Sequence, residues 1–139
     1  KKVAATFRNG MKPLLCVGEN AKERTEGKTA RKISMQINNA FKGLQAEQAK
    51  EVVVAYEPLW AIGSGQAATA KDAQEVCHLI REKLTTMFGE KISRQVRILY
   101  GGSVNENNAV AFKISGIDGV LVGGASLNAK AFSAIVRSF

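Results

Sequence analysis

The chain has 139 residues, 45% of them hydrophobic, and its 20 lysines and arginines outnumber its 12 aspartates and glutamates, which gives a net charge of +8. Such a chain can build one ordinary hydrophobic core, so its composition excludes a disordered protein and predicts a single domain over residues 1–139. Its apolar runs are shorter than the roughly 18 residues that span a bilayer, and residues 1–10 lack the apolar block of a secretory signal. We therefore expect a cytoplasmic protein without a membrane partner.

The surplus of basic residues leaves a nucleic-acid binder open as an alternative, because clustered Lys and Arg release counterions from a phosphate backbone. Residues 19–32, ENAKERTEGKTARK, instead interleave basic and acidic side chains, as on an ordinary solvated helix face. We therefore rank a nucleic-acid binder last among the possible functions and expect no nucleic-acid partner. The two cysteines, Cys16 and Cys77, are far apart in the sequence and match no metal-ligand or redox spacing, so we expect free thiols rather than a disulfide, and no metal. We also expect no cofactor.

Residues 1–11 have the pattern of an amphipathic helix, because Val3, Phe7 and Met11 recur at helical spacing. Gly10 is placed to end this helix. The chain does not begin with methionine, and the pattern resembles the second half of a helix. We therefore expect that an earlier part of the fold precedes residue 1.

Four apolar runs follow, and their cores are continuous rather than alternating in polarity. Such runs are typical of strands that are buried on both faces in a parallel sheet. Because helical patterns separate them, the order predicts an α/β fold with right-handed crossovers. The expected strands are residues 12–19, 51–58, 96–103 and 118–126. The expected helices are residues 28–42, 70–88, 105–114 and 128–137.

Polar residues and glycines gather where the expected strands end. They are Glu19, Glu57, residues 100–103, Gly123 and Gly124. Ligands of parallel α/β proteins bind at this edge of the sheet. We therefore expect a functional site at the carboxyl ends of the strands.

The turns after the last two expected strands, YGGS (100–103) and VGGAS (122–126), suit a phosphate group. Their glycines let backbone N–H groups approach a ligand closely, and each turn leads into a predicted helix whose N-terminus favours an anion. Either turn alone is better explained as a tight βα connection. Two consecutive units with the same pattern favour a phosphate site.

Glu57 ends the second apolar run, and Pro58 fixes the chain directly after it. A carboxylate at the mouth of a buried strand can be partly desolvated, which raises its proton affinity toward that of a general base. The plain alternative is an acid paired with a neighbouring lysine or arginine. The following loop favours the base, because Trp60 and Ile62 are apolar where a surface loop is normally polar. A loop of this kind suits a lid that excludes water.

Three stretches occur in a characteristic order and spacing: AYEPLWAIGSG (55–65), YGGSV (100–104) and GVLVGGASL (119–127), with PLLCVGE (13–19) before them. Together they closely resemble the motifs of the triosephosphate isomerase family over essentially the whole chain. The resemblance implies the last four βα units, from the fifth strand to the eighth helix, of a TIM (β/α)8 barrel. It also implies that the N-terminal half, which supplies the family's catalytic lysine and electrophilic histidine, is missing from this sequence.

By that resemblance, Glu57 is the base that moves a proton as dihydroxyacetone phosphate and glyceraldehyde 3-phosphate interconvert. The backbone N–H groups expected to bind the phosphate are those of Gly63, Ser103, Gly123 and Gly124. The residues expected to form, hinge or steady the lid are Trp60, Ile62, Gly65, Tyr100 and Ser103. The residues expected beside the site in a supporting role are Glu19 and Cys16.

The resemblance implies no catalytic role for the chain's one histidine, His78, or for Lys12. His78, the one histidine, falls on the predicted helix 70–88, and Lys12 precedes the first strand, so neither is expected to contact substrate. The chain by itself is therefore predicted to be inactive or severely impaired, and a half-barrel that binds phosphate without turnover remains the alternative. The family is usually homodimeric, so a homodimer is expected of the full-length protein.

A half-barrel has two open sheet edges and an apolar inner face. We therefore expect either the other half of the barrel or a second half-barrel to cover these surfaces.

Overall fold

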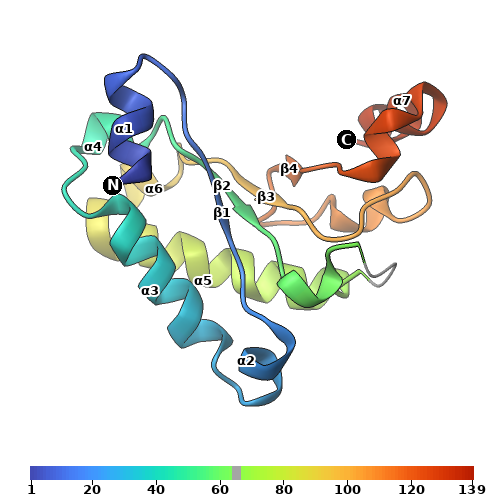
Figure 1. Ribbon diagram of the computed structural model, residues 1–139, viewed down its shortest axis with the longest axis horizontal. Coiled ribbons are helices and arrows are strands. Elements are labelled where there is room, and N and C mark those ends of the chain that lie inside the picture. Colours follow the sequence, from blue (N-terminus) through green and yellow to red (C-terminus); the bar gives the residue numbers. More distant parts are fainter. Residues whose placement is uncertain (64–66) are drawn as a thin grey trace.

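The computed structural model describes residues 1–63 and 67–139, and a four-stranded parallel sheet forms its centre (Figure 1). The strands lie in chain order, so each βα unit adds its strand beside the previous one. The strands are β1 Leu14–Val17, β2 Val53–Tyr56, β3 Ile98–Tyr100 and β4 Gly119–Val120. The prediction of a parallel α/β sheet is confirmed, although each strand is shorter than the apolar run that predicted it.

Helices separate the strands along the chain. The α-helices are α1 Lys2–Arg8, α2 Ala21–Thr25, α3 Thr29–Phe41, α4 Ala46–Ala49, α5 Ala70–Phe88, α6 Glu90–Ser93 and α7 Ala129–Ser138. Three short 3-10 helices are η1 Leu59–Ala61, η2 Ala109–Phe112 and η3 Gly124–Leu127. The predicted helices at 28–42, 70–88 and 128–137 therefore correspond to α3, α5 and α7.

The helix α5 has clear signals at both ends. Thr69 accepts a hydrogen bond from the backbone N–H of Asp72 at 3.1 Å and so caps the first turn. Gly89, with φ of 80°, ends the helix in a conformation that other residues rarely adopt. The helix buries one side, formed by Ala73, Val76, Cys77, Ile80 and Leu84.

The helix predicted for residues 105–114 is wrong, since only the short η2 forms there. Asparagine side chains bind the local backbone instead. Asn105 Oδ1 accepts from the N–H of Asn107 at 2.9 Å, and Asn108 Oδ1 accepts from the N–H of Asn105 at 2.8 Å. These bonds satisfy backbone groups that a helix would otherwise use, so they favour the turn.

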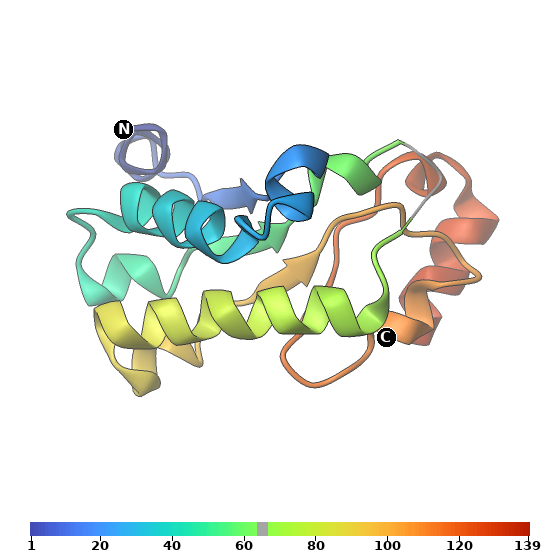
Figure 2. The same ribbon diagram turned by 90° about the horizontal axis from the view of Figure 1, so that it is seen from below.

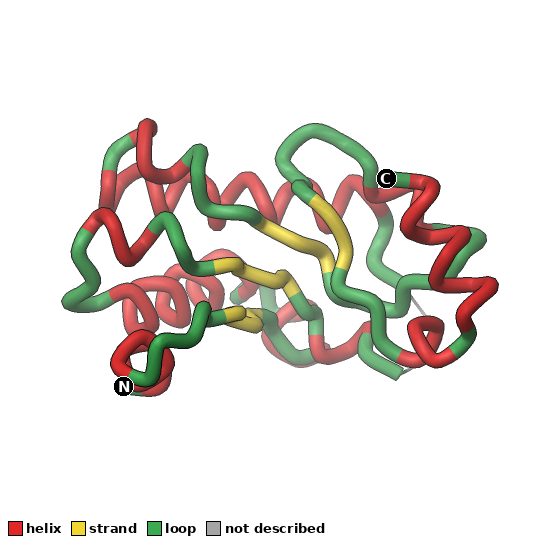
Figure 3. The backbone as a smooth tube through the Cα atoms, turned by 90° about the horizontal axis from the view of Figure 1, so that it is seen from above, coloured by secondary structure: helices red, strands yellow, loops and turns green. Residues whose placement is uncertain are grey.

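The two longest helices pack on one face of the sheet. The helix α3 contacts β1, while α5 contacts β2 and β3 and also packs along α3 (Figure 2). Figure 3, seen from the opposite side, shows the strands in front of these two helices. Buried side chains such as Ile33, Ile37 and Ile80 fill the space between the layers.

The sheet is open at both ends within residues 1–63 and 67–139, because β1 pairs only with β2 and β4 only with β3. On the edge strand β1, Leu14 is 47% exposed and Cys16 is also exposed. An open edge with exposed apolar side chains is a surface to which a further strand can pair. None of the described helices is long and apolar enough to cross a membrane.

Candidate functional site

The strand register aligns one residue from each strand in a row at the carboxyl edge of the sheet. The row consists of Val17, Tyr56, Tyr100 and Val120. The next residues along the four strands are Gly18, Glu57, Gly101 and Leu121. Hydrogen bonds extend the ladder into this second row, because the N–H of Glu57 donates to the carbonyl of Val17 at 2.7 Å and that of Gly101 to Tyr56 at 2.9 Å. The register therefore holds Glu57 between two glycines.

Both glycines are required by the close approach of Glu57. A Cβ at Gly18 would lie 1.8 Å from the backbone carbonyl oxygen of Glu57, and one at Gly101 would lie 2.7 Å from its Cγ. The side chain of Gln36 fixes Gly18 in turn, since it accepts from the Gly18 N–H and donates to the Gly18 carbonyl, each at 3.1 Å. The backbone and side chain of Glu57 thus occupy the space that side chains at positions 18 and 101 would need.

Glu57 lines a cavity of about 440 Å³ at this edge of the sheet. The predicted site residues that line it with Glu57 are Ile62, Gly63, Ser103, Gly123 and Gly124. Of the described residues around this cavity, Glu57 is the one that carries a charge. A cavity of this size fits a small ligand, and the glycine-rich turns present backbone rather than side chains to it.

The segments on both sides of the predicted lid are fixed by β3 and the turn after it. The hydroxyl of Tyr100 accepts from the N–H of Ala68 at 2.9 Å, and the hydroxyl of Ser103 donates to the carbonyl of Ala61 at 2.6 Å. The N–H of Ser103 also donates to this carbonyl, at 3.1 Å. The expected contact of this N–H with a phosphate stays a prediction. Gly65 lies outside the described residues.

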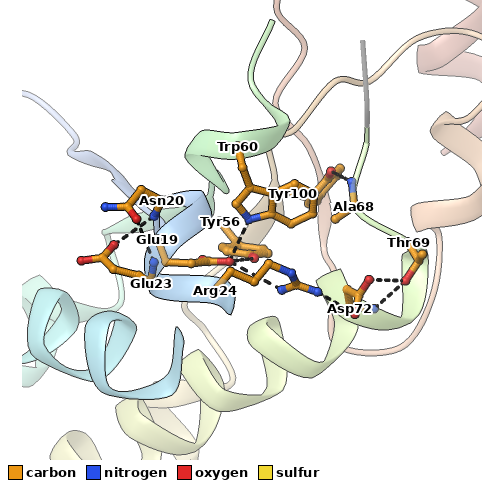
Figure 4. A network of polar contacts seen from close by, with 10 residues as sticks. All are labelled: Glu19, Asn20, Glu23, Arg24, Tyr56, Trp60, Ala68, Thr69, Asp72 and Tyr100. Atoms are coloured by element: carbon orange, nitrogen blue, oxygen red, sulfur yellow. Dashed lines mark hydrogen bonds and ion pairs between the residues drawn. The ribbon is translucent and has the colours of Figure 1, made fainter. Parts of the chain in front are cut away.

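Glu19 is buried, and its carboxylate lies next to the indole nitrogen of Trp60 (Figure 4). Its Oε1 accepts hydrogen bonds from the hydroxyl of Tyr56 and from the indole N–H of Trp60, both at 3.0 Å. Burial, together with the neighbouring Glu19 carboxylate, raises the pKa of Tyr56, so its hydroxyl remains a donor. Glu19 thus supports Trp60 and is not among the described residues that line the cavity.

Cys16 lies on β1 beside Glu57. Partial burial of the thiol, the charge of Glu57 and a hydrogen bond between the two side chains raise the pKa of Cys16 to about 11. The thiol therefore stays protonated at neutral pH and can donate to the Glu57 carboxylate. A supporting role of Cys16 beside Glu57 stays a prediction.

We expect Cys16 to react slowly with iodoacetamide at neutral pH despite its exposure, because the thiolate is the nucleophile. In a Cys77→Ser variant, the alkylation rate should rise with a midpoint near pH 11. Glu57→Gln should lower this midpoint, because it removes the negative charge beside the thiol. A midpoint that Glu57→Gln leaves unchanged would show that the two side chains do not interact.

His78 and Lys12 both lie away from the cavity. His78 is exposed on α5 and its ring lies against Gly116, where an added Cβ would approach it to 2.4 Å. Lys12 precedes β1 and pairs with Glu51 at 2.9 Å. Across the described parts of the chain, no three His, Cys, Asp or Glu side chains converge in a way that could hold a metal ion.

Sequence analysis did not identify two residues of this region, Gln36 and Arg24. Gln36 carries no catalytic pattern, and its contact with Gly18 joins segments far apart in the chain. Arg24 belongs to the interleaved charges of residues 19–32, although it approaches Glu19, Trp60 and Asp72 in the structure. The one local signal was Asn20, whose side chain forms a capping box with Glu23 at the start of α2.

The fold and the cavity together define a class: parallel βα proteins with a small-ligand site at the carboxyl ends of the strands, in which a carboxylate faces glycine-rich turns. A family model described as triosephosphate isomerase matches residues 1–139. The chain belongs to the triosephosphate isomerase family.

Curated relatives resemble almost the whole of this chain. The triosephosphate isomerase of Acetivibrio thermocellus is 49% identical over 138 residues, which cover 99% of this chain and 55% of the relative. That of Moorella thermoacetica is 51% identical over 138 residues, with the same coverage of both chains. That of Dictyoglomus thermophilum is 45% identical over 139 residues, which cover 99% of this chain and 56% of the relative. The chain thus spans about half the length of the relatives it matches.

Proposed function

We propose that this chain is the C-terminal half of a triosephosphate isomerase barrel. Together with the other half, it interconverts dihydroxyacetone phosphate and glyceraldehyde 3-phosphate. The observation that supports this assignment is that Glu57 and the glycine-rich turns after β3 and β4 line one cavity. The open edges at β1 and β4 are where the remaining strands of the barrel would pair.

Glu57 acts as the base in this proposal. Its carboxylate removes a proton from the carbon next to the substrate carbonyl and returns it to the former carbonyl carbon. The hydroxyl proton of the substrate passes to the former carbonyl oxygen in the same interconversion, so no proton is gained or lost overall. The glycine at position 101 lets the carboxylate reach the cavity, and the protonated Cys16 thiol lies beside it. The lysine and the electrophilic histidine of the family come from the other half of the barrel.

The phosphate of the substrate binds the backbone N–H groups of Gly63, Gly123 and Gly124, with the Ser103 N–H joining them when it leaves the Ala61 carbonyl. Backbone donors fixed in this way stabilise an anion without reorganising. Trp60, Ile62 and Gly65 belong to the lid that covers the bound substrate. We propose further that the complete protein is a cytoplasmic homodimer that acts in glycolysis and gluconeogenesis.

A chimera tests this function. In it, residues 1–139 replace the matching segment of 138 residues in the Acetivibrio thermocellus relative. We expect kcat/KM for glyceraldehyde 3-phosphate within about tenfold of that of the relative, since a small misplacement at the new interface already lowers the rate. This chain alone should show no isomerase activity.

The unmodified relative and this chain alone are the two controls. A folded chimera without activity would refute the proposed function. Phosphate binding without turnover would then favour a non-catalytic half-barrel, and full activity of the isolated chain would refute the need for the other half.

A further inference from the structure

Arg24, at the end of α2, lies between η1 and the start of α5, and both of these segments are far from Arg24 in the sequence (Figure 4). Its guanidinium carbon is 4.8 Å from the centroid of the Trp60 ring, in the geometry of a cation–π contact. Its Nη2 lies 2.8 Å from Oδ1 of Asp72, and its Nη1 lies 3.6 Å from Oε1 of Glu19. Trp60 belongs to η1, which leads into the cavity wall, and Asp72 belongs to the first turn of α5.

On the α5 side, Arg24 supports the helix start. Oδ2 of Asp72 accepts from the hydroxyl of Thr69 at 2.7 Å, and the N–H of Asp72 donates to the same hydroxyl oxygen at 3.1 Å. The Thr69 hydrogen bond first and the Arg24 charge next keep the pKa of Asp72 below its usual range, so Asp72 remains an anionic partner. Ala68, next to Thr69, is bound to Tyr100. The ion pair therefore supports the first turn of α5.

On the η1 side, Arg24 compensates a buried charge. Glu19 is 0% exposed, and its Oε2 accepts no hydrogen bond within the described part of the molecule. A buried carboxylate is costly unless a cation lies near it, and Arg24 supplies that cation. Because Glu19 holds the indole N–H of Trp60 while Arg24 stacks on the ring, both contacts fix the same side chain.

Arg24 is itself held in a defined position. The capping box between Asn20 and Glu23 fixes the start of α2, with hydrogen bonds of 2.9 Å and 2.8 Å. The Arg24 side chain is 31% exposed, in contrast to a freely solvated arginine. Its planar fork can bind a carboxylate while its face stacks on an aromatic ring, which a lysine cannot do.

We propose that Arg24 is a positioning residue that couples η1 to the start of α5 and thereby holds Ile62 and Gly63 in the wall of the cavity. The inference rests on the proposed function, because its consequence is weaker phosphate binding. Glu57 is positioned independently by β2, Gly18 and Gly101. Loss of Arg24 therefore weakens the binding of phosphate while it leaves the chemical step largely intact.

The first experiment compares Arg24→Gln and Arg24→Lys in the chimera, with Arg31→Gln as the matched control. Arg31 is exposed on the neighbouring helix α3, so its replacement removes the same charge at a different place. We expect both Arg24 variants to raise the inhibition constant of inorganic phosphate and KM by about tenfold, with kcat changed by less than about threefold. Arg31→Gln should change these values by less than about twofold.

The second experiment separates coupling from a general structural role. A double-mutant cycle of Trp60→Phe and Asp72→Asn should be non-additive in kcat/KM by about fivefold while Arg24 is present. The same cycle should become additive in the Arg24→Lys background, where the negative charge of Glu19 still has a nearby cation and the fold is retained. Thermal unfolding confirms that each variant is folded at the assay temperature.

Three results would overturn the inference: phosphate inhibition within twofold of the unmodified chimera in both Arg24 variants, a loss confined to kcat, or non-additivity that persists with Lys at position 24. An inactive unmodified chimera would instead refute the proposed function. Calorimetric titration of inorganic phosphate into the same set of variants then decides the inference, and equal affinities with and without Arg24 would refute it.

Discussion

Glu57→Gln in the chimera should lower kcat/KM by about a thousandfold, because glutamine keeps the size and shape of the side chain but cannot accept a proton at neutral pH. The loss should appear in kcat, while KM changes little. The glycine-rich turns that face the phosphate are separate from the carboxylate and remain in place. Steady-state rates with glyceraldehyde 3-phosphate, measured with and without the substitution, check this expectation.

Glu82→Gln is the matched control, because Glu82 is an exposed carboxylate on α5. It should change kcat/KM by less than about twofold. Undiminished turnover of Glu57→Gln would remove Glu57 from the reaction and leave the cavity without a base. Equal losses in both variants would point to a general effect of charge on the fold.

The sequence predicted the parts of the fold that local patterns control. Thr69 and Gly89 directly flank α5, so the signals for both of its ends are local in the sequence. The continuous apolar runs predicted the parallel strands for the same reason. The helix predicted for residues 105–114 does not form, because the asparagine side chains at 105 and 108 bind the backbone of a turn.

The candidate site divides in a similar way. Glu57 and the glycine-rich turns could be predicted because they follow apolar runs, and parallel strands bring their carboxyl ends to one edge. Arg24 and Gln36 could not, because each acts on a segment that the fold alone brings near. The alternating charges around Arg24 are equally compatible with a solvated face, and only the contacts with Trp60 and Asp72 distinguish it.

Glycine in this site has two different functions, which sequence inspection does not separate. Gly123 and Gly124 face open space, since an added Cβ would meet no heavy atom within 4 Å. Their absence of side chains leaves backbone N–H groups accessible to a ligand. Gly18 and Gly101 instead face the backbone and side chain of Glu57 at distances too short for any side chain. The first pair thus leaves backbone donors free for the phosphate in the function proposed above, and the second pair lies against Glu57 and positions its carboxylate.

Gly18→Ala should therefore disrupt both stability and activity. The added Cβ would lie 1.8 Å from the carbonyl oxygen and 2.6 Å from the carbonyl carbon of Glu57, and backbone atoms cannot rotate away. The strands β1 and β2 would have to separate, which we expect to lower the free energy of unfolding of the chimera by about 3 kcal/mol. Urea unfolding measures this loss, and kcat/KM should fall with it because Glu57 moves with its backbone.

Gly124→Ala provides the control for stability, because it adds the same methyl group where no heavy atom lies within 4 Å. Its free energy of unfolding should differ from that of the unmodified chimera by less than about 1 kcal/mol. If Gly18→Ala unfolded at the same urea concentration and with the same slope as Gly124→Ala, the backbone of Glu57 could not lie against Gly18. Contacts other than the alignment of β1 with β2 would then position the carboxylate. This result would refute the proposal that Glu57 is held in the row of residues that follows the strand ends.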